Sequence, residues 1–184
     1  CLLGSKRQYY EFVCDECLHG AENGHSKVLL WGDSHAAHMM PALMEAYPDV
    51  AVYHVGMVGC PPVFGYESKL PMAPKDCPEL NQQVLREIPE LRKNGLQGIV
   101  ISARWPMYLR QRTLAVSQTQ ATAYSDPQKL AEARAEMQSR FDETLTVLER
   151  AGVRVLVLAP NPETVYSPPL CIGLRRGAHC NVPR

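Results

Sequence analysis

The sequence predicts a three-layer α/β/α domain with a parallel central sheet, an arrangement of the flavodoxin-like kind. Segments of strand character alternate along the chain with segments of helical character, and each strand segment is apolar throughout. Such strands are typical of a parallel sheet that helices cover on both faces. The 184 residues are 46% hydrophobic and 21% charged, which suits one globular domain and leaves little room for a second.

Four segments have the continuous apolar character of buried strands. A single domain over 1–184 is expected, with its α/β core at 27–159. Residues 1–26 show no clear period and are expected to form a disulfide-stapled extension, and 160–184 an irregular tail. The predicted strands are 27–31, 50–55, 98–103 and 153–159.

Three segments are predicted to be helical, and two of them, 35–47 and 79–93, carry apolar residues at helical spacing. Asp126 and Pro127 are typical of the N-cap and the first position of a helix, and Gly152 supplies a left-handed cap after its end. Pro89 is expected to kink or shorten the helix that contains it. The predicted helices are 35–47, 79–93 and 127–151.

Composition and patterning exclude several classes of protein. The 19 Lys and Arg residues equal the 19 Asp and Glu residues, whereas nucleic-acid binding depends on an excess of clustered cations. No run of about 18 apolar residues is present to span a bilayer, and no Cys or His spacing indicates a metal site. The chain starts at Cys1 with no leader before it, so we expect it to have been cut from a longer protein or processed.

Cysteine content favours an oxidising compartment, because reducing compartments seldom favour seven cysteines in a chain of this size. Cys60 and Cys77 flank a proline-rich loop and are expected to staple it. Cys171 and Cys180 flank a Gly/Arg loop and are expected to do the same. Closing a loop of about 15 residues contributes roughly 3 kcal/mol in the chain-entropy model.

The remaining cysteines leave alternatives open. Cys14 and Cys17 have the CxxC spacing of redox and zinc motifs, but no second CxxC or histidine pair lies at ligand spacing. Structural disulfides are favoured over this chemistry, with Cys1 pairing to one of the two and one thiol left over. A lipidated amino terminus at Cys1 is a weaker alternative.

The turn after the first strand is the most informative site. Ligands of open parallel sheets bind beyond the carboxyl ends of the strands, and here Gly32 permits a tight turn just before Ser34. The following helix directs its free amides and its positive dipole end at that serine. An exposed Ser34 hydroxyl beside its own amide suits acyl chemistry. The plainer alternative is that Ser34 only caps the helix.

Residues 28–38, which read VLLWGDSHAAH, resemble the first conserved block of SGNH (GDSL-like) hydrolases. More narrowly, they resemble the SGNH domain fused to bacterial acyltransferase-3 membrane proteins, which O-acetylate lipopolysaccharide and other envelope glycans. Segments 59–62 and 103–105 agree with that subfamily, and the resemblance extends from Cys1 to about Cys180. It implies an SGNH fold.

The resemblance implies a role for several residues. Ser34 matches the nucleophile, and Gly59 matches the glycine whose amide joins the oxyanion hole. The third block normally supplies an asparagine, which this sequence lacks. Arg104 is a candidate for stabilising the oxyanion, against a surface ion pair, and Trp105 is a candidate for stacking on a sugar or acyl group, against a core position. His35 is expected to shape the turn or contact substrate.

The family's catalytic base is missing from these 184 residues. SGNH enzymes take it from a late Asp-x-x-His, but no Asp follows Asp142 here. His179 is the only late histidine, and an exposed loop position beside Cys180 is the favoured interpretation. Four strands are countable against the family's five, so we expect a chain truncated before the last strand and the base that it carries.

These observations favour a periplasmic serine acyltransferase or esterase domain. Ser34 would carry the acyl group, acetyl by the resemblance, to or from glycan hydroxyls. No cofactor or metal is expected. A membrane acyltransferase domain would deliver the donor, tethering the protein to the inner membrane. The rival is a non-catalytic glycan-binding or scaffold module, and a third reading is a thiol-disulfide protein that uses Cys14 and Cys17.

Overall fold

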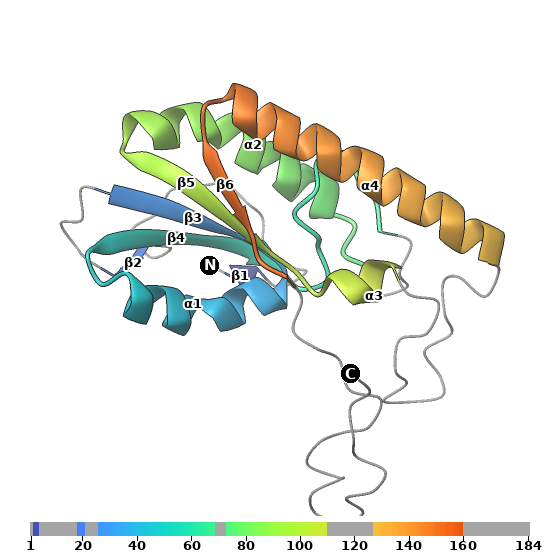
Figure 1. Cartoon of the computed structure of the whole chain (residues 1–184), viewed down its shortest axis with the longest axis horizontal. Helices are drawn as coiled ribbons and strands as arrows, with labels where there is room; N and C mark the ends of the chain where they lie inside the picture. The colour runs from blue at the N-terminus through green and yellow to red at the C-terminus, as the bar shows by residue number, and fades with distance from the viewer. Residues whose placement is uncertain (1, 4–17, 21–25, 69–72, 110–126, 160–184) are drawn as a thin grey trace, which may run out of the picture.

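A computed structural model describes residues 2–3, 18–20, 26–68, 73–109 and 127–159 (Figure 1). Its sheet has the strand order β1-β4-β3-β5-β6, with β2 pairing to β4 off this path. All pairs along the path are parallel, and β2 alone is antiparallel. The strands are β1 (Leu2–Leu3), β2 (Leu18–Gly20), β3 (Ser26–Gly32), β4 (Val50–Met57), β5 (Leu96–Ser102) and β6 (Arg154–Val157).

The four strands predicted from apolar runs are confirmed as β3 to β6. β1 and β2 were not predicted, because segments of two and three residues show no periodicity. They pair with opposite ends of one edge of β4, Leu2 with Gly56 and Leu18 with Tyr53. The sheet is therefore mixed, and it extends into the segment ahead of residue 27.

The helices form the outer layers of the predicted α/β/α arrangement. α1 (Ser34–Ala46) covers one face of the sheet, and α2 (Cys77–Lys93) and α4 (Pro127–Arg150) cover the other (Figure 1). α2 is not shortened at Pro89, which lies inside it. The short helix α3 (Trp105–Leu109), which follows β5, was not predicted from the sequence.

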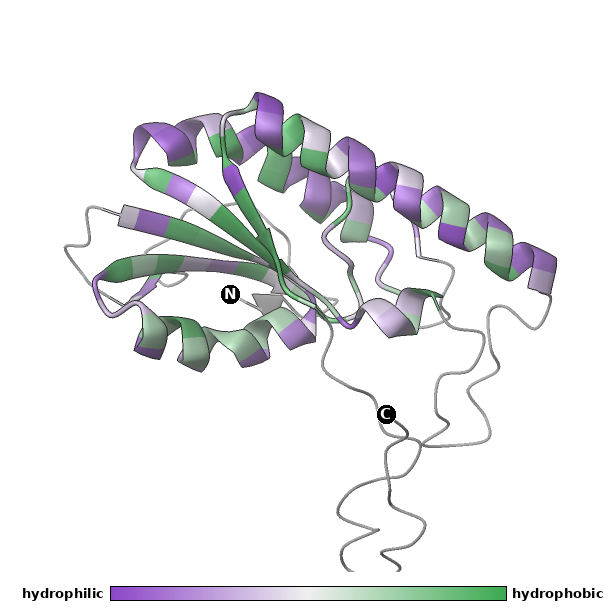
Figure 2. Cartoon of the chain, in the orientation of Figure 1, coloured by the Kyte–Doolittle hydropathy of each residue, from purple (hydrophilic) through white to green (hydrophobic). Residues whose placement is uncertain are grey.

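The strands carry the hydrophobic core, as their colouring in Figure 2 shows, whereas α2 and α4 alternate between polar and apolar residues. Leu29, Trp31, Ile99 and Ile101 pack toward α2 and α4. Between these positions, Leu30 and Val100 are among the residues that pack under α1. This period of two places each strand between two apolar layers, and fully burying one such side chain contributes about 2 kcal/mol.

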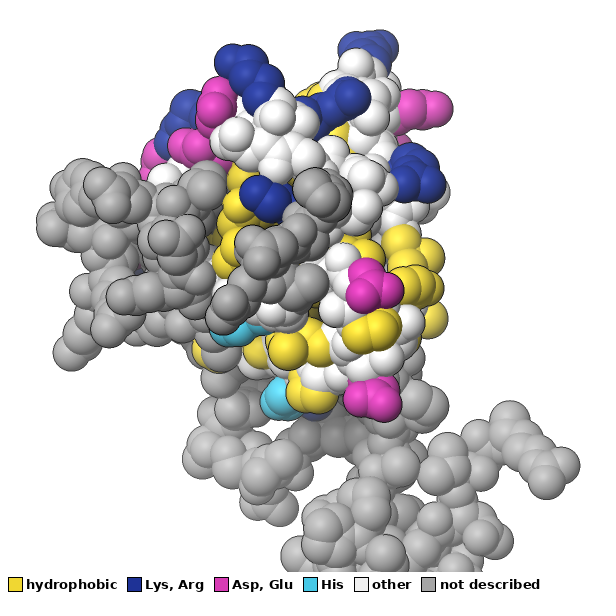
Figure 3. All heavy atoms as spheres, turned by 90° about the vertical axis from the view of Figure 1, so that its left-hand side faces the viewer, with side chains coloured by type: hydrophobic (Ala, Val, Ile, Leu, Met, Phe, Trp, Pro, Cys, Tyr) yellow, Lys and Arg dark blue, Asp and Glu magenta, His cyan; other side chains and the backbone are white. Residues whose placement is uncertain are grey.

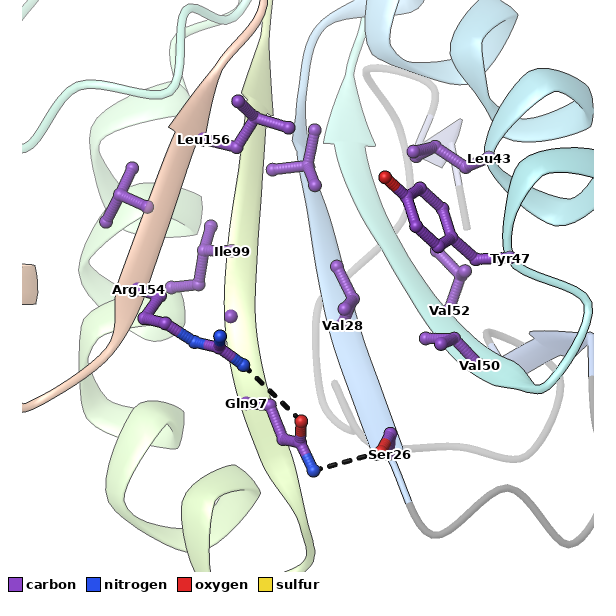
Figure 4. Close-up of a pocket in the computed structure, with 13 residues that line it drawn as sticks. Ser26, Val28, Leu43, Tyr47, Val50, Val52, Gln97, Ile99, Arg154 and Leu156 are labelled. Carbon is purple, nitrogen blue, oxygen red and sulfur yellow. Dashed lines mark hydrogen bonds between the residues drawn. The ribbon is translucent and has the colours of Figure 1, made fainter.

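The face under α1 is only partly covered. A groove of about 380 Å³ lies there beside the strands, with Val28, Val52 and Leu156 in its apolar wall (Figure 4). Its polar end is at the strand starts, where Gln97 donates to Ser26 Oγ over 2.9 Å. The groove therefore lies toward the end of the sheet opposite to the predicted site.

Charge is distributed unevenly over the two outer layers. In the space-filling view from the left of Figure 1, most of the visible Lys and Arg side chains lie at the top, on the side of α2 and α4 (Figure 3). Hydrophobic and histidine side chains are visible lower down, toward α1. No helix of the described ranges is both long and apolar enough to cross a bilayer.

Candidate active site

Three predicted site positions lie at the carboxyl edge of the sheet, on three adjacent strands. In the register of the sheet, Gly32 of β3 lies between Gly56 of β4 and Ser102 of β5. Ser34, Gly59 and Arg104 each follow the last residue of their strand by two positions. The topology thus brings together three segments that are far apart in sequence.

Close backbone approach explains two glycines at this edge. A Cβ added to Gly32 would collide with the carbonyl oxygen of Ser102, and one added to Gly56 would collide with the carbonyl oxygen of Gly32. Any larger residue would therefore push the backbone of the neighbouring strand away. The glycines keep the Ser34 turn close to both neighbouring strands.

Asp33, not Ser34, is the N-cap of α1. Its backbone is extended, and its Oδ1 accepts a hydrogen bond from the His35 amide over 2.8 Å. The amides of Ala36 and Ala37 donate to the Asp33 carbonyl over 3.1 and 3.4 Å. The alternative that Ser34 only caps the helix is wrong, because its neighbour supplies the cap and Ser34 is the first helical residue.

This cap leaves the Ser34 amide available. The next three amides are bonded to Asp33, whereas the Ser34 amide donates to no other residue of the described ranges. It lies at the amino end of α1, where the helix dipole favours negative charge. The Ser34 side chain is partly buried rather than fully exposed. The Ser34 hydroxyl and amide thus both belong to the turn at the carboxyl edge of the sheet.

The second oxygen of Asp33 binds the segment after β5. Oδ2 accepts from the Arg104 amide over 2.9 Å and from the Tyr108 hydroxyl over 2.8 Å. The Asp33 residue is only 1% exposed, so these bonds replace the water that a carboxylate otherwise needs. Because donors already occupy both oxygens, Asp33 is poorly placed to orient a catalytic histidine.

Gly59 occupies a tight turn that follows β4. Its φ of 75° is in the left-handed region, which favours glycine. The turn is closed by a hydrogen bond from the Cys60 amide to the Met57 carbonyl over 3.0 Å. The Gly59 amide makes no hydrogen bond to another described residue. Its availability is what the predicted oxyanion role requires.

The loop after Gly59 is buried and fixed at several points. The predicted Cys60–Cys77 disulfide is confirmed, with a Cα–Cα distance of 5.3 Å. Asn81, which is fully buried, donates through Nδ2 to the carbonyls of Pro61 and Val63 over 2.9 and 3.0 Å. These contacts anchor the loop to α2.

Arg104 and Trp105 are both partly buried. The Trp105 indole donates to the Leu158 carbonyl over 3.1 Å, and its ring meets Phe141 edge to face at 5.3 Å. Trp105 therefore holds the end of β6 against α4. Its stacking on substrate and the oxyanion role of Arg104 stay predictions.

The histidines form no catalytic constellation within the described ranges. The rings of His35 and His38 lie 5.9 Å apart on α1. His54 is buried in β4, and burial lowers its pKa to about 4, so it is neutral at pH 7. His179, Cys171 and Cys180 lie outside the described residues, as do Cys1, Cys14 and Cys17.

No cluster of metal-ligating side chains is present in the described part of the chain. Sequence reasoning missed Asp33 and Tyr108, the two residues with the most specific geometry at the site. The available signal for Asp33 was its type, since aspartate is among the best N-caps. No local signal marked Tyr108, because its partner is 75 residues away.

A family model for the SGNH domain fused to AT3 domains matches residues 1–184. The chain therefore belongs to this family of SGNH domains. Among solved structures, it is similar to the lipopolysaccharide acetyltransferase periplasmic domain of Salmonella ser. Paratyphi A, at 16% identity and a TM-score of 0.47. That match covers 89% of this chain and 55% of the neighbour, so the chain spans just over half of its length. No curated protein matches the chain.

Proposed function

We propose that this domain transfers acyl groups through an ester on Ser34. The Ser34 Oγ attacks the carbonyl carbon of an acyl donor and loses its proton to a base. The tetrahedral intermediate then collapses, and the leaving oxygen of the donor departs with a proton. A glycan hydroxyl next attacks the Ser34 ester, accepts the acyl group and regenerates the serine. Attack by water instead gives esterase activity.

The observation that carries the proposal is the capping of α1 by Asp33. It leaves the Ser34 hydroxyl and amide at a helix amino end, where negative charge is stabilised. Gly59, after the adjacent strand, would donate a second amide to the oxyanion. Arg104 would add positive charge, and His35 and Trp105 would contact substrate.

The substrate class rests on the family. Because this SGNH family is fused to AT3 domains, we propose an acyl donor delivered by that membrane domain and a cell-envelope glycan acceptor, with acetyl as the acyl group. The Cys60–Cys77 disulfide supports an oxidising compartment, and hence a periplasmic or other extracytoplasmic site. The reaction needs no bound cofactor.

The test is labelling of the full-length parent protein with a serine-reactive fluorophosphonate, followed by intact mass and peptide mapping. The full-length protein is used because this family of SGNH domains is fused to AT3 domains. We expect one adduct on Ser34, which Ser34→Ala removes. Ser102→Ala is the matched control, since Ser102 ends the adjacent strand and is only 5% exposed. It should leave the adduct intact.

Absence of an adduct from the full-length protein, or an adduct that survives Ser34→Ala, would overturn this mechanism. Glycan binding without labelling would then favour the rival function of a glycan-binding module. Two sequence features support this alternative function, the missing third-block asparagine and the missing Asp-x-x-His.

A further inference from the structure

The Tyr108 hydroxyl has no direct role in the proposed acyl chemistry, yet it bonds the residue next to the nucleophile. Tyr108 lies on α3 and is 0% exposed. Its hydroxyl donates to Asp33 Oδ2 over 2.8 Å, across 75 residues of sequence. A fully buried tyrosine hydroxyl needs a hydrogen-bond partner, because burying a hydroxyl without one costs free energy.

The Tyr108 hydroxyl stays protonated and so remains a hydrogen-bond donor. Burial, followed by the adjacent Asp33 charge and the hydrogen bond to it, raises the pKa of Tyr108 well above its ordinary value of 10. The Tyr108 hydroxyl therefore keeps its proton, and with it the ability to donate to Asp33, at neutral pH and well above it.

Asp33 transmits this bond to the nucleophile turn. A carboxylate is planar, so fixing Oδ2 against Tyr108 and the Arg104 amide also fixes the direction of Oδ1. Oδ1 holds the His35 amide, the first capping bond of α1, over 2.8 Å. Ser34 lies between Asp33 and His35, which this bond joins. The orientation of Ser34 therefore depends on the plane of the Asp33 carboxylate.

Tyr108 also contacts the other side of the site. Its ring belongs to a buried cluster with Val63 and Tyr66 from the loop after Gly59, and with Met137 from α4. One side chain thus joins the Ser34 turn through a hydrogen bond and the Gly59 loop through packing. The helix that carries Tyr108, α3, begins directly after Arg104.

We propose that Tyr108 is a positioning residue that sets the Ser34 turn relative to the Gly59 loop by donating to Asp33. This inference rests on the proposed acyl transfer for its catalytic consequence. It predicts that removing the hydroxyl alone slows attack by Ser34 without weakening the binding of substrate, because only the alignment of the turn changes.

The test is Tyr108→Phe in the full-length protein, which keeps the ring and removes one oxygen. We expect fluorophosphonate labelling of Ser34 to slow about tenfold in its maximal rate, with the half-saturating concentration of the probe unchanged. Tyr53→Phe is the matched control, since Tyr53 is a 6% exposed tyrosine on β4. It should label at the wild-type rate.

Asp33→Asn tests the same bond from the other partner. If Tyr108 acts through Asp33, the double variant should label no more slowly than Asp33→Asn alone. Multiplicative effects of the two changes, or a wild-type rate in Tyr108→Phe, would overturn the inference.

A second readout separates this inference from the proposed function. Should wild-type protein fail to label, the acyl mechanism falls, and amide hydrogen exchange decides the positioning role by itself. We expect faster exchange at the His35 and Arg104 amides in Tyr108→Phe than in Tyr53→Phe. Equal exchange at both amides would refute positioning.

Discussion

The Ser34 turn and the Gly59 loop flank the same edge of the sheet, but different forces hold them. Hydrogen bonds to one buried carboxylate fix the Ser34 turn, from the His35 and Arg104 amides and from Tyr108. A disulfide and a buried amide side chain fix the Gly59 loop. Hydrogen bonds are directional and orient the group that would react, whereas a cross-link mainly limits how far its loop can move.

The largest effect is expected from Asp33→Ala, which tests whether hydrogen bonds to this carboxylate hold the Ser34 turn. It leaves two amides and a tyrosine hydroxyl without their acceptor, and we expect the free energy of unfolding to fall by about 4 kcal/mol. Urea denaturation measures this loss. Asp76→Ala is the control, because Asp76 is the N-cap of α2 but makes no side-chain cap hydrogen bond. Equal losses in both variants would show that the carboxylate is not a structural anchor.

The next effect concerns the Gly59 side. Replacing Cys60 and Cys77 together by alanine opens a cross-link between residues 17 apart, and we expect a loss of about 3 kcal/mol in stability. The rate of fluorophosphonate labelling of Ser34 should fall less than in Asp33→Ala, because the hydrogen bonds of Asp33 remain. Denaturation and labelling of the double variant check both points. A variant as stable as the wild type would mean that Asn81 and its partners suffice to hold the loop.

The smallest effect depends on pH and involves β4, which leads into the Gly59 loop. The pKa of His54 is about 4 in the folded chain and about 6.5 when unfolded. Between these values the unfolded chain binds the extra proton, so stability is present above pH 6.5 and is lost as the pH falls toward 4. We expect a loss of about 2 kcal/mol between pH 7 and pH 5.

His54→Gln removes the titrating group and serves as the comparison. Thermal unfolding at pH 7 and pH 5 should show a smaller acid effect in this variant than in the wild type. An identical acid effect in the two proteins would assign the pH dependence to other groups.

Local features of the sequence predicted most of the fold. The four long strands have no charged residue except near their ends, and the helices between them have an apolar stripe. Gly152 adopts the left-handed φ of 70° that its place after a helix predicted. These signals are short-range, so a single sequence contains them.

The site was only partly predictable for the same reason. Ser34 and Gly59 were found because a turn after a strand is a local pattern, reinforced by family resemblance. The capping role was assigned to Ser34 as an alternative because serine and aspartate are both good caps. In the folded domain, Asp33 is the residue that caps α1.

By itself, the sequence determined the order of the four longer strands and the three longer helices, the glycine turns and the position of the serine. Each of these depends on residues close together in the chain. The tertiary structure decided what surrounds that serine. The donors to Asp33 come from residues 2, 71 and 75 positions away, and they meet only once β3 and β5 are paired. Burial then makes those bonds strong, since no water competes for the carboxylate.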